Sequence, residues 1–283
     1  MQSYFIFANP YKPETVTVAS KLLHILNEYN TNVYLEPWLY SNINTGQALR
    51  FEDISSDISA IISLGGDGTL LRSVPIAAEN NVPILGINLG HIGFLMEAEV
   101  QQLSDVAKRL ISGDFEIEKR MLLEAVINKD KKYLLLNDIA FTRGNNPSSI
   151  VMSVKADDET VFNIHGDGVL VSTPTGTTGY GISAGGPVIS PWLECIAIIP
   201  VCSHVLHQRP VVLPDNQVIH ISTNVPPFGR SYQIVIDGQI SLEIEESVDI
   251  AIKRAKEMVS FIRFSKQRFL TRLHEKQMEW NAK

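Results

Sequence analysis

The sequence predicts an α/β domain built on a parallel sheet, followed by a mostly antiparallel β domain. Two observations lead to this prediction. Over the first third of the chain, short apolar runs alternate with helical patterns, an order that favours parallel strands joined by right-handed crossovers. After Gly113, many short apolar runs are joined by polar turns with little helical pattern between them, which is typical of antiparallel sheets.

The first third supplies the alternating elements. Apolar residues at helical spacing predict helices, and short runs rich in β-branched and aromatic residues predict strands. Pro75 predicts a kink or an early end in one helix, because proline lacks the backbone N–H that a helix interior needs. The predicted strands are 4–8, 33–35, 57–64 and 82–88, and the predicted helices are 14–29, 70–78 and 100–110.

The remainder of the chain is rich in strand patterns. A helix with Phe269, Leu270, Leu273 and Met278 on its apolar side follows the last of them. The predicted strands are 115–128, 133–142, 150–156, 160–164, 169–173, 196–201, 217–223, 232–236 and 258–264.

Composition narrows the class of protein. The chain has 283 residues, of which 45% are hydrophobic and 19% charged, as in a globular protein of about two domains. The net charge of −7 argues against a general nucleic-acid surface, which needs a basic face for phosphates.

Cysteine usage and hydropathy predict the compartment. The two cysteines, Cys195 and Cys202, are too few for a disulfide framework and fit a reduced setting. The apolar run 4–8 is too short for a signal peptide, and no stretch approaches the ~20 apolar residues of a membrane span. We therefore expect a cytoplasmic protein that binds neither membrane nor nucleic acid.

A glycine-rich turn interrupts two apolar segments near residue 65. Gly65, Gly66 and Gly68 surround Asp67, and Thr69 follows them. Glycines let the backbone approach a ligand closely, and a turn between a strand and a helix can direct N–H groups at a phosphate. The competing interpretation is an ordinary strand-to-helix turn in which Asp67 caps the helix. The turn by itself does not separate these two interpretations.

A second glycine-dense segment covers 166–187. It places many hydroxyl groups and bare backbone positions after a strand, which suits the sugar and phosphate parts of a nucleotide, and Tyr180 could line a base. Tight β-turns needed only for packing are the alternative. Between the two segments, Asn137 and Asp138 form a polar pair inside an apolar run, where one of them would be buried or face a ligand; taken alone, a turn pair at the end of a strand is the better explanation.

Most familiar catalytic templates are absent from the sequence. There is no G-x-x-x-x-G-K-[ST] phosphate loop and no G-x-S-x-G elbow, and Leu71 stands where a redox dinucleotide fold needs its third glycine. Cys202, His204 and His207 have metal-like spacing without a further partner and are better explained as polar loop residues. His91 and His165 lie beside the glycine segments, where each could contact a ligand or serve the loop alone.

Three segments recur in one order, and together they resemble the NAD kinase family. They are Leu-Gly-Gly-Asp-Gly-Thr at 64–69, Leu-Asn-Asp at 136–138, and the run 167–187 with its Thr-Pro-Thr-Gly and Ser-Ala-Gly-Gly-Pro. The resemblance spans about residues 3 to 280. Further matching segments are 88–95, 209–213, 236–239 and 276–280.

This resemblance implies an activity and a fold. The activity is transfer of phosphate from ATP, or from polyphosphate, to the adenosine ribose 2′-hydroxyl of NAD, with Mg²⁺ or another divalent ion. The implied fold is an α/β domain with a Rossmann-like or phosphofructokinase-like parallel sheet over 1–98, and a β-sandwich that binds NAD over 99–254. Residues 255–283 are expected to pack back on the first domain. Homotetramers or homodimers are implied as well.

The resemblance also implies roles for residues. Asp67 becomes the group that contacts the reacting hydroxyl and acts as base, and no metal ligand is assigned. The phosphate or ATP site comprises Gly65, Gly66, Gly68 and Thr69, and the NAD site comprises Asp67, Gly68, Asn137, Asp138, His165, Asp167, Thr178, Gly179, Tyr180 and Ser183.

The chain departs from the family pattern at three positions. Thr177 and Gly179 stand where serine and alanine are commoner, and His165 stands where several members carry arginine. Two other functions compete with NAD kinase. A lipid kinase shares Gly-Gly-Asp-Gly-Thr but is not expected to carry 167–187. A catalytically silent NAD(P)-binding sensor is disfavoured by the intact Asp67, Asn137 and Asp138.

Overall fold

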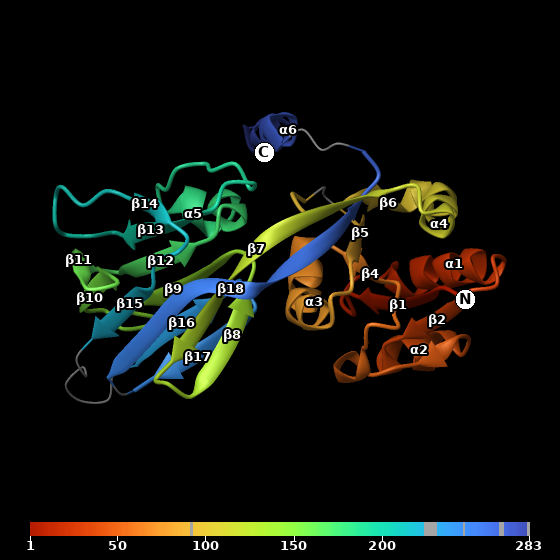
Figure 1. Ribbon diagram of the computed structural model, residues 1–283, viewed down its shortest axis with the longest axis horizontal. Coiled ribbons are helices and arrows are strands. Elements are labelled where there is room, and N and C mark those ends of the chain that lie inside the picture. Colours follow the sequence, from red (N-terminus) through yellow and green to blue (C-terminus); the bar gives the residue numbers. More distant parts are fainter. Residues whose placement is uncertain (91–92, 224–230, 246, 266–268, 282–283) are drawn as a thin grey trace. The chain divides into compact units, whose positions relative to one another are not determined.

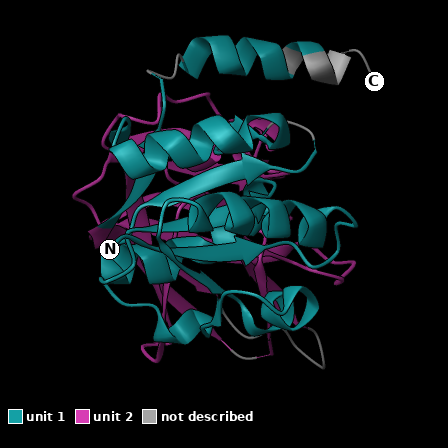
Figure 2. Ribbon diagram, turned by 90° about the vertical axis from the view of Figure 1, so that its right-hand side faces the viewer, with its two compact units in different colours: residues 1–119, 258–283 teal, residues 120–257 magenta. Residues whose placement is uncertain are grey.

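The computed structural model of the chain describes residues 1–90, 93–223, 231–245, 247–265 and 269–281. They form two compact units, which Figure 2 distinguishes by colour: unit 1 comprises 1–119 and 258–283, and unit 2 comprises 120–257. The boundary drawn from the sequence, between 98 and 99, precedes helix α4 (Leu103–Ser112), whereas the compact units divide after it. The apolar face of α4 joins the core of unit 1, and this packing explains the difference.

Unit 1 alternates strands and helices as predicted (Figure 1). Strand β18 leads the chain from unit 2 back into unit 1, and a helix is the last element of unit 1. Besides α4, the elements are β1 (Ser3–Ala8), α1 (Thr15–Asn27), β2 (Asn32–Leu35), α2 (Pro37–Ile43), β3 (Gln47–Ala48), the 3₁₀ turn η1 (Phe51–Asp53), β4 (Ala60–Gly65), α3 (Asp67–Asn80), β5 (Ile84–Asn88), β6 (Ala98–Glu99), the 3₁₀ turn η2 (Val100–Gln102), the start of β7 (Glu116–Ile127), the end of β18 (Val248–Arg263) and α6 (Phe269–Asn281).

The unit 1 sheet has the order β3-β2-β1-β4-β5-β18, and the pairs along it are parallel. Both of its faces are covered. Tyr4 and Ile6 of β1 belong to one core together with α1 and α4. The alternate residue Phe7 points to the other face, where Arg72 of α3 lies over its ring at 5.0 Å from the centroid. The sheet is therefore of the predicted parallel α/β type, with side chains packed on both of its faces.

Helix α3 begins at Asp67, immediately after the glycine turn. It continues past Pro75 to Asn80, so the early end that proline suggested does not occur. Proline removes a single intrahelical hydrogen bond. Val74 and Ala77 are fully buried on either side of it, and this packing is enough to keep the helix continuous.

Unit 2 consists mainly of antiparallel strands, with two very short helices in the second glycine segment. The elements are the rest of β7, β8 (Lys131–Leu135), β9 (Asp138–Thr142), β10 (Ile150–Ala156), β11 (Glu159–Gly166), β12 (Gly168–Ser172), η3 (Thr175–Thr178), α5 (Tyr180–Ser183), β13 (Cys195–Val201), β14 (Val211–Pro214), β15 (Ile219–Thr223), β16 (Tyr232–Ile236), β17 (Ile240–Ile244) and the start of β18.

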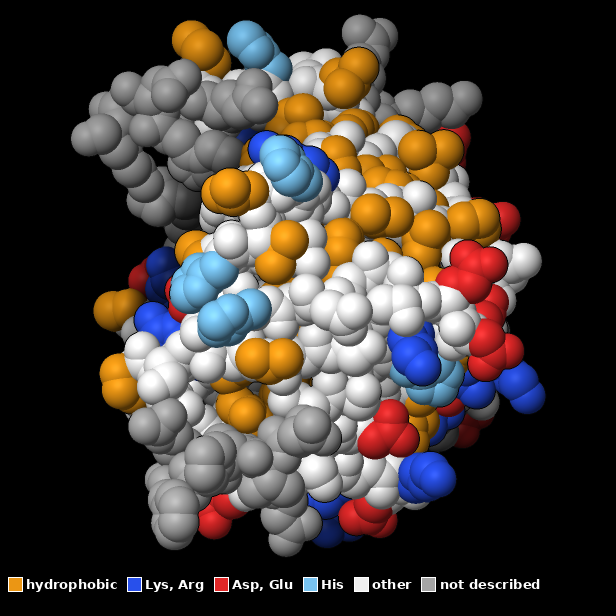
Figure 3. All heavy atoms as spheres, turned by 90° about the vertical axis from the view of Figure 1, so that its left-hand side faces the viewer, with side chains coloured by type: hydrophobic (Ala, Val, Ile, Leu, Met, Phe, Trp, Pro, Cys, Tyr) orange, Lys and Arg blue, Asp and Glu red, His pale blue; other side chains and the backbone are white. Residues whose placement is uncertain are grey.

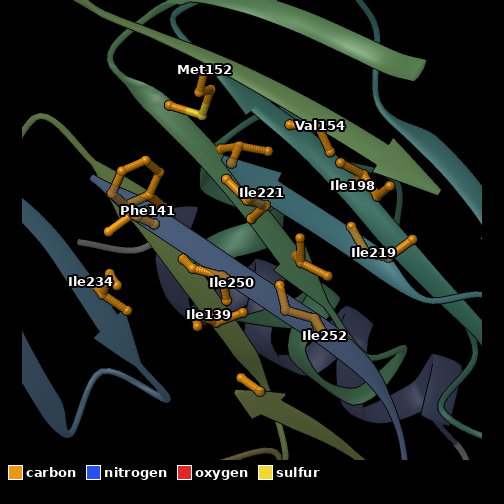
Figure 4. Close-up of a cluster of buried hydrophobic side chains, with 14 of the residues drawn as sticks. Ile139, Phe141, Met152, Val154, Ile198, Ile219, Ile221, Ile234, Ile250 and Ile252 are labelled. Carbon is orange, nitrogen blue, oxygen red and sulfur yellow. The ribbon is translucent and has the colours of Figure 1, made fainter. Parts of the chain in front are cut away.

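Two sheets pack face to face in unit 2. One has the order β11-β10-β15-β18, with β7 and β8 beside β18; the other has the order β14-β13-β12-β9-β16-β17. Figure 4 shows the core between them, with Ile139 and Phe141 of β9 directed at Ile221 and Ile250 of the opposite sheet. The predicted β-sandwich is confirmed.

The run 133–142, predicted as one strand, is two strands. β8 ends at Leu135 and β9 begins at Asp138, so Asn137 lies in the bend between them. β9 pairs with β12 and β16, whereas β8 pairs with β7. The apolar run therefore passes from one sheet to the other, and the polar pair stands at this change.

Candidate functional site

The glycine turn of unit 1 lies at the carboxyl edge of the parallel sheet. The β4–β5 ladder extends to the pair Gly65–Asn88, and the N–H of Leu89 donates to the carbonyl of Gly65 at 2.8 Å. The turn after β4 and the loop after β5 are therefore neighbours, as the strand order predicts. Ligands of open parallel sheets bind at this edge.

Asp67 is the first residue of α3, and its carboxylate reaches the loop after β5. Oδ2 accepts the N–H of Phe94 at 2.7 Å, and Oδ1 accepts the N–H of Leu95 at 3.1 Å. The helix is preceded by Gly66, which has no capping side chain. The interpretation of Asp67 as a simple helix cap is therefore wrong; it joins two loops instead.

The close approach of Asp67 to this loop depends on Gly93. A Cβ built on Gly93 would overlap the carboxyl group of Asp67. The glycine therefore leaves the space that the carboxylate occupies, and any other residue at this position would displace it.

Opposing effects set the ionisation of Asp67. Burial raises the pKa of its carboxyl, whereas the N–H groups of Leu95 and Phe94 and then the charges of Arg272 and Lys276 lower it; burial prevails. The ordinary pKa of about 3.9 assumed for a free aspartate therefore does not apply here. Each oxygen keeps a further lone pair, so the carboxylate can still accept a hydroxyl.

The predicted phosphate residues surround the start of α3. Gly68 is exposed and Gly66 half-buried, whereas Thr69 is buried and packs against Gly65. The first N–H groups of a helix have no partner within it and carry a partial positive charge. Exposed glycine backbone at this position can therefore receive a phosphate, as the spacing suggested.

Unit 2 contains a pocket of about 350 Å³ at the bend between β8 and β9. Three of the predicted NAD residues, Asn137, Asp138 and Tyr180, line it together. Thr142, Gln233, Val235, Asp237 and Gly238 complete much of the wall.

Asp237 holds the bend in place. Its Oδ2 accepts the N–H of Leu136 at 2.9 Å, and its Oδ1 accepts those of Asn137 and Asp138 at 2.7 and 3.1 Å. On the other side, the N–H of Thr173 donates to the carbonyl of Asn137 at 2.9 Å. The backbone of Asn137 is thus fixed from both directions, which leaves its side chain for the pocket.

Burial and a like charge govern Asp138. It is 6% exposed, and burial followed by the charge of Asp237 raises its pKa to about 7. Burial also raises the pKa of Asp237, to about 6, although its three N–H partners oppose the shift. The two neighbouring carboxyls therefore resist double ionisation, and Asp138 keeps a proton for part of the time near neutral pH.

The other predicted NAD residues of unit 2 lie outside the lining of this pocket. Asp167 accepts Arg143 Nε at 2.7 Å. Thr178 donates its hydroxyl to the carbonyl of Thr175 at 3.1 Å. Gly179 and Ser183 are exposed in and beside α5. The structure brings Asn137, Asp138 and Tyr180 together and leaves these residues around them.

His165 belongs to a surface group. Its Nε2 lies 2.7 Å from the hydroxyl of Ser149, and its ring centroid lies 4.9 Å from that of His204. Histidine side chains are exposed among apolar ones on the face shown in Figure 3. His91 lies outside the described residues.

Cys202, His204 and His207 find no further metal-ligating partner among the described residues. Over the described part of the chain, no three His, Cys, Asp or Glu side chains are grouped to hold a metal ion. Among the helices described, none is long and apolar enough to span a membrane.

Sequence reasoning missed two supporting residues. The sequence marks Asp237 only as part of the matching segment 236–239, although the Asp-Gly dipeptide is typical of a turn and Asp237 adopts φ of +50°. Arg272 carried no signal, because an arginine on a helix more than 170 residues beyond Phe94 says nothing of its partners. It donates to the carbonyls of Phe94 and Met96.

Taken together, the fold and these residues define a class: a parallel α/β unit with a Gly-Gly-Asp-Gly-Thr turn at its ligand edge, joined to an antiparallel β-sandwich with a carboxylate-lined pocket. Family models match both parts of the chain, the ATP-NAD kinase N-terminal domain over 5–115 and the ATP-NAD kinase C-terminal domain over 136–264. The chain belongs to the NAD kinase family, and the resemblance seen in the sequence is confirmed.

Curated relatives agree over the full length. The chain is 32% identical to a protein named NAD kinase from Heliobacterium modesticaldum, with 99% of each chain covered. It is 33% identical to one from Moorella thermoacetica, with 100% of this chain and 91% of the relative covered.

Solved structures show the same fold. A yeast NADH kinase complexed with NADH aligns with a TM-score of 0.88 at 24% identity, covering 100% of this chain and 89% of that one. An NAD kinase from Archaeoglobus fulgidus in complex with ATP aligns with a TM-score of 0.75 at 25% identity, covering 98% of each chain.

Proposed function

We propose that this protein is an NAD kinase that transfers the γ-phosphate of ATP, or a phosphate of polyphosphate, to the adenosine ribose 2′-hydroxyl of NAD to give NADP. Membership of the family supports the kinase and its acceptor. The observation that carries the chemistry is the placement of Asp67: a carboxylate at a helix start, on the ligand edge of the sheet, held by two N–H groups.

Asp67 is assigned the role of binding the ribose hydroxyl that receives the phosphate. Phosphoryl transfer passes through a loose transition state, so orienting the nucleophile matters more than a strong base. The N–H groups of Phe94 and Leu95 fix both oxygens of Asp67, which limits its rotamers and leaves lone pairs for the ribose hydroxyl. Asp67 then orients that hydroxyl and accepts its proton as the new bond forms.

The backbone around Asp67 is assigned the phosphates. Gly66 and Gly68 flank Asp67 at the start of α3, where the helix dipole favours an anion. Gly65 ends β4 beside them, and the N–H of Thr69 donates to the carbonyl of Gly66 at 2.9 Å, so the N–H groups proposed for the phosphates are those of Gly66 and Gly68. The chain has no phosphate-loop lysine, so this backbone and the ion carried by the donor neutralise the triphosphate.

The bend between β8 and β9 is assigned to NAD. Asn137, Asp138 and Tyr180 share one pocket, which supports their role directly. Asp167, Thr178, Gly179, Ser183 and His165 are proposed to surround the bound dinucleotide. His165 replaces an arginine common in the family, so we expect a weaker hold on a negatively charged group at this position.

The donor is proposed to be the magnesium complex of ATP. Mg²⁺ prefers oxygen ligands and binds through substrate phosphates with one or two carboxylates rather than a full protein cage. The described residues fit that arrangement. Asp67 lies beside the backbone that is assigned to the phosphates, and no group of three acidic, histidine or cysteine side chains among the described residues could hold the ion by itself. The ion supplies charge neutralisation on the transferred group.

The assembly and compartment are proposed from the family and the composition. We expect a homotetramer or homodimer in the cytoplasm. Both cysteines are free, with Cys195 buried and Cys202 exposed, which suits a reducing compartment.

The competing functions lose support. A lipid kinase would share only the glycine turn, whereas the family models match both units and the relatives match the whole chain. A silent sensor has no reason to keep Asp67 and its two N–H donors.

A coupled assay tests the proposal. The protein is incubated with ATP, Mg²⁺ and NAD, and NADP is followed with an NADP-specific dehydrogenase; polyphosphate is tested as donor in parallel. We expect NADP that depends on both donor and NAD. Absence of NADP with every phosphate donor would overturn the proposed function.

A further inference from the structure

The backbone of Phe94–Met96 in unit 1 is held from two sides. The N–H groups of Phe94 and Leu95 point at Asp67. The carbonyls of Phe94 and Met96 point the other way, and Arg272 Nη1 donates to them at 2.8 and 2.7 Å. The same three-residue segment thus links the carboxylate of the glycine turn to an arginine of the final helix.

A second arginine, Arg263, binds the remaining carbonyl of this segment. Arg263, which is 3% exposed, donates from Nη1 to the carbonyl of Leu95 at 2.9 Å. Glu118 accepts its Nε at 3.1 Å, and Glu97 lies 3.4 Å from its Nη1. All three carbonyls of Phe94–Met96 are therefore hydrogen-bonded to guanidinium groups from the last part of the chain.

The charges around the pair Asp67–Arg272 come from few elements. The positive charges of Arg272 and Lys276, both on α6, lower the pKa of Asp67. The charge of Arg263 lowers the pKa of Arg272, whereas the charges of Glu97, Asp67 and Glu275 raise it. Burial lowers the pKa of Arg272 from its ordinary value, but an arginine remains protonated at physiological pH.

We propose that Arg272 is a positioning residue for phosphoryl transfer: it holds the peptide units of Phe94–Met96 so that two N–H groups fix and polarise the carboxylate of Asp67. This rests on the proposed role of Asp67 at the acceptor hydroxyl. Arg272 acts through the backbone and through its charge, without being assigned any contact with substrate.

The physical argument has two parts. The rate of phosphoryl transfer falls when the carboxylate that orients the hydroxyl shifts by even about 1 Å. The N–H donors that fix this carboxylate therefore matter for turnover. The positive charge of Arg272 and the N–H groups that it orients also favour the ionised form of Asp67, against the burial that disfavours it. Loss of Arg272 should therefore affect both turnover and its pH dependence.

A purely structural role for Arg272, anchoring α6, makes a different prediction. It would lower the melting temperature without moving the pH at which activity rises. Arg109 provides a matched control, because it also lies in unit 1 and donates to a backbone carbonyl outside Phe94–Met96, that of Phe264 at 2.6 Å.

The test uses the full-length chain and the variants Arg272→Gln, Arg272→Lys and Arg109→Gln. For each, kcat and KM for NAD are measured across pH, together with thermal melting. In Arg272→Gln we expect kcat to fall about tenfold or more, KM for NAD to change less than threefold, and the acid limb of the kcat profile to move to higher pH. The shift has this sign because removing a positive charge raises the pKa of the carboxyl that must be ionised.

The lysine variant keeps the charge and a donor. We expect it to restore the acid limb to the wild-type position while recovering kcat only in part, and Arg109→Gln to match wild type in both respects. If Arg272→Gln fails to fold, the comparison of Arg272→Lys with wild type decides.

Two results would overturn the proposal. One is a folded Arg272→Gln with wild-type kcat and an unmoved acid limb; the other is a lysine variant equal to wild type in kcat throughout. If the wild-type protein makes no NADP at all, the proposed function has failed instead, and the two failures are thereby distinguished.

Discussion

Each unit contains a carboxyl whose pKa is raised by burial, Asp67 at the start of α3 and Asp138 at the start of β9, but the two have different neighbours. Asp67 of unit 1 accepts two N–H groups and faces the positive charges of Arg272 and Lys276. Asp138 of unit 2 faces the second carboxyl of Asp237, and that charge raises its pKa further. Burial acts on both groups in the same direction, and the neighbours decide how far it is opposed.

This difference indicates two kinds of work. Asp67 is supported as an acceptor, which is what a group orienting a hydroxyl requires. Asp138, with a pKa of about 7, spends part of its time protonated near neutral pH and can then donate a hydrogen bond into its pocket. The chain thus uses aspartate both as a hydrogen-bond acceptor, at Asp67, and as a hydrogen-bond donor, at Asp138.

The largest effect is expected from Asp67→Asn. The amide keeps the size of the side chain but loses the charge, so turnover should fall by about 10²- to 10⁴-fold, while NAD binding by calorimetry stays close to wild type. Asp57→Asn, at an exposed position of the same unit, is the control and should match wild type. Near-normal turnover of Asp67→Asn would show that another group acts on the hydroxyl.

Gly93→Ala should have the next largest effect. The new Cβ would overlap the carboxyl of Asp67 and push it out of reach of its N–H donors, so kcat should fall by about tenfold to a hundredfold.

Its control is Gly90→Ala in the same loop, where the Cβ would meet only the flexible end of Lys12 at 2.9 Å. Gly90→Ala should therefore leave kcat within about twofold of wild type. Equal kcat values in both variants would contradict the close-packing argument.

A smaller effect, on stability, is expected from Asp138→Asn. Since folding raises the pKa of Asp138 to about 7, the wild-type protein loses stability as pH rises from the unfolded value near 4 through 7. The neutral amide removes that loss, so the stability of the variant relative to wild type should increase by about 2.5 kcal/mol from pH 5 to pH 8. NAD affinity should fall at the same time.

Thermal melting of both proteins at the two pH values checks this prediction. Asp249→Asn, at an exposed position of unit 2, should show no such pH dependence. A difference between wild type and Asp138→Asn that is the same at both pH values would contradict the account of the Asp138–Asp237 pair.

Much of the fold could be predicted because it follows local patterns. The βαβ order placed the turn at Gly65–Thr69 and the loop after Asn88 at one edge, and the ladder that ends at Gly65–Asn88 confirms it. The split between β8 and β9 was missed, since a continuous apolar run does not reveal that Leu135 and Ile139 belong to different sheets.

The candidate site could be predicted only where its residues stand out from the local sequence pattern. Asp67 stands among glycines, and Asn137–Asp138 interrupts an apolar run. Asp237 and Arg272 act from about 100 and about 200 residues away, through backbone N–H and carbonyl groups that every residue carries. Such support depends on tertiary contacts and leaves no trace in local spacing.

The measurement that tests the contrast most directly is a ¹³C NMR titration of protein labelled at the aspartate carboxyls, with resonances assigned from Asp67→Asn and Asp138→Asn. Asp138 should titrate near pH 7, as its pKa indicates. The midpoint of Asp67 should rise in Arg272→Gln, because the positive charge of Arg272 favours the ionised carboxyl, whereas that of Asp138 should stay unchanged. A midpoint of Asp67 that does not move in Arg272→Gln would contradict the account.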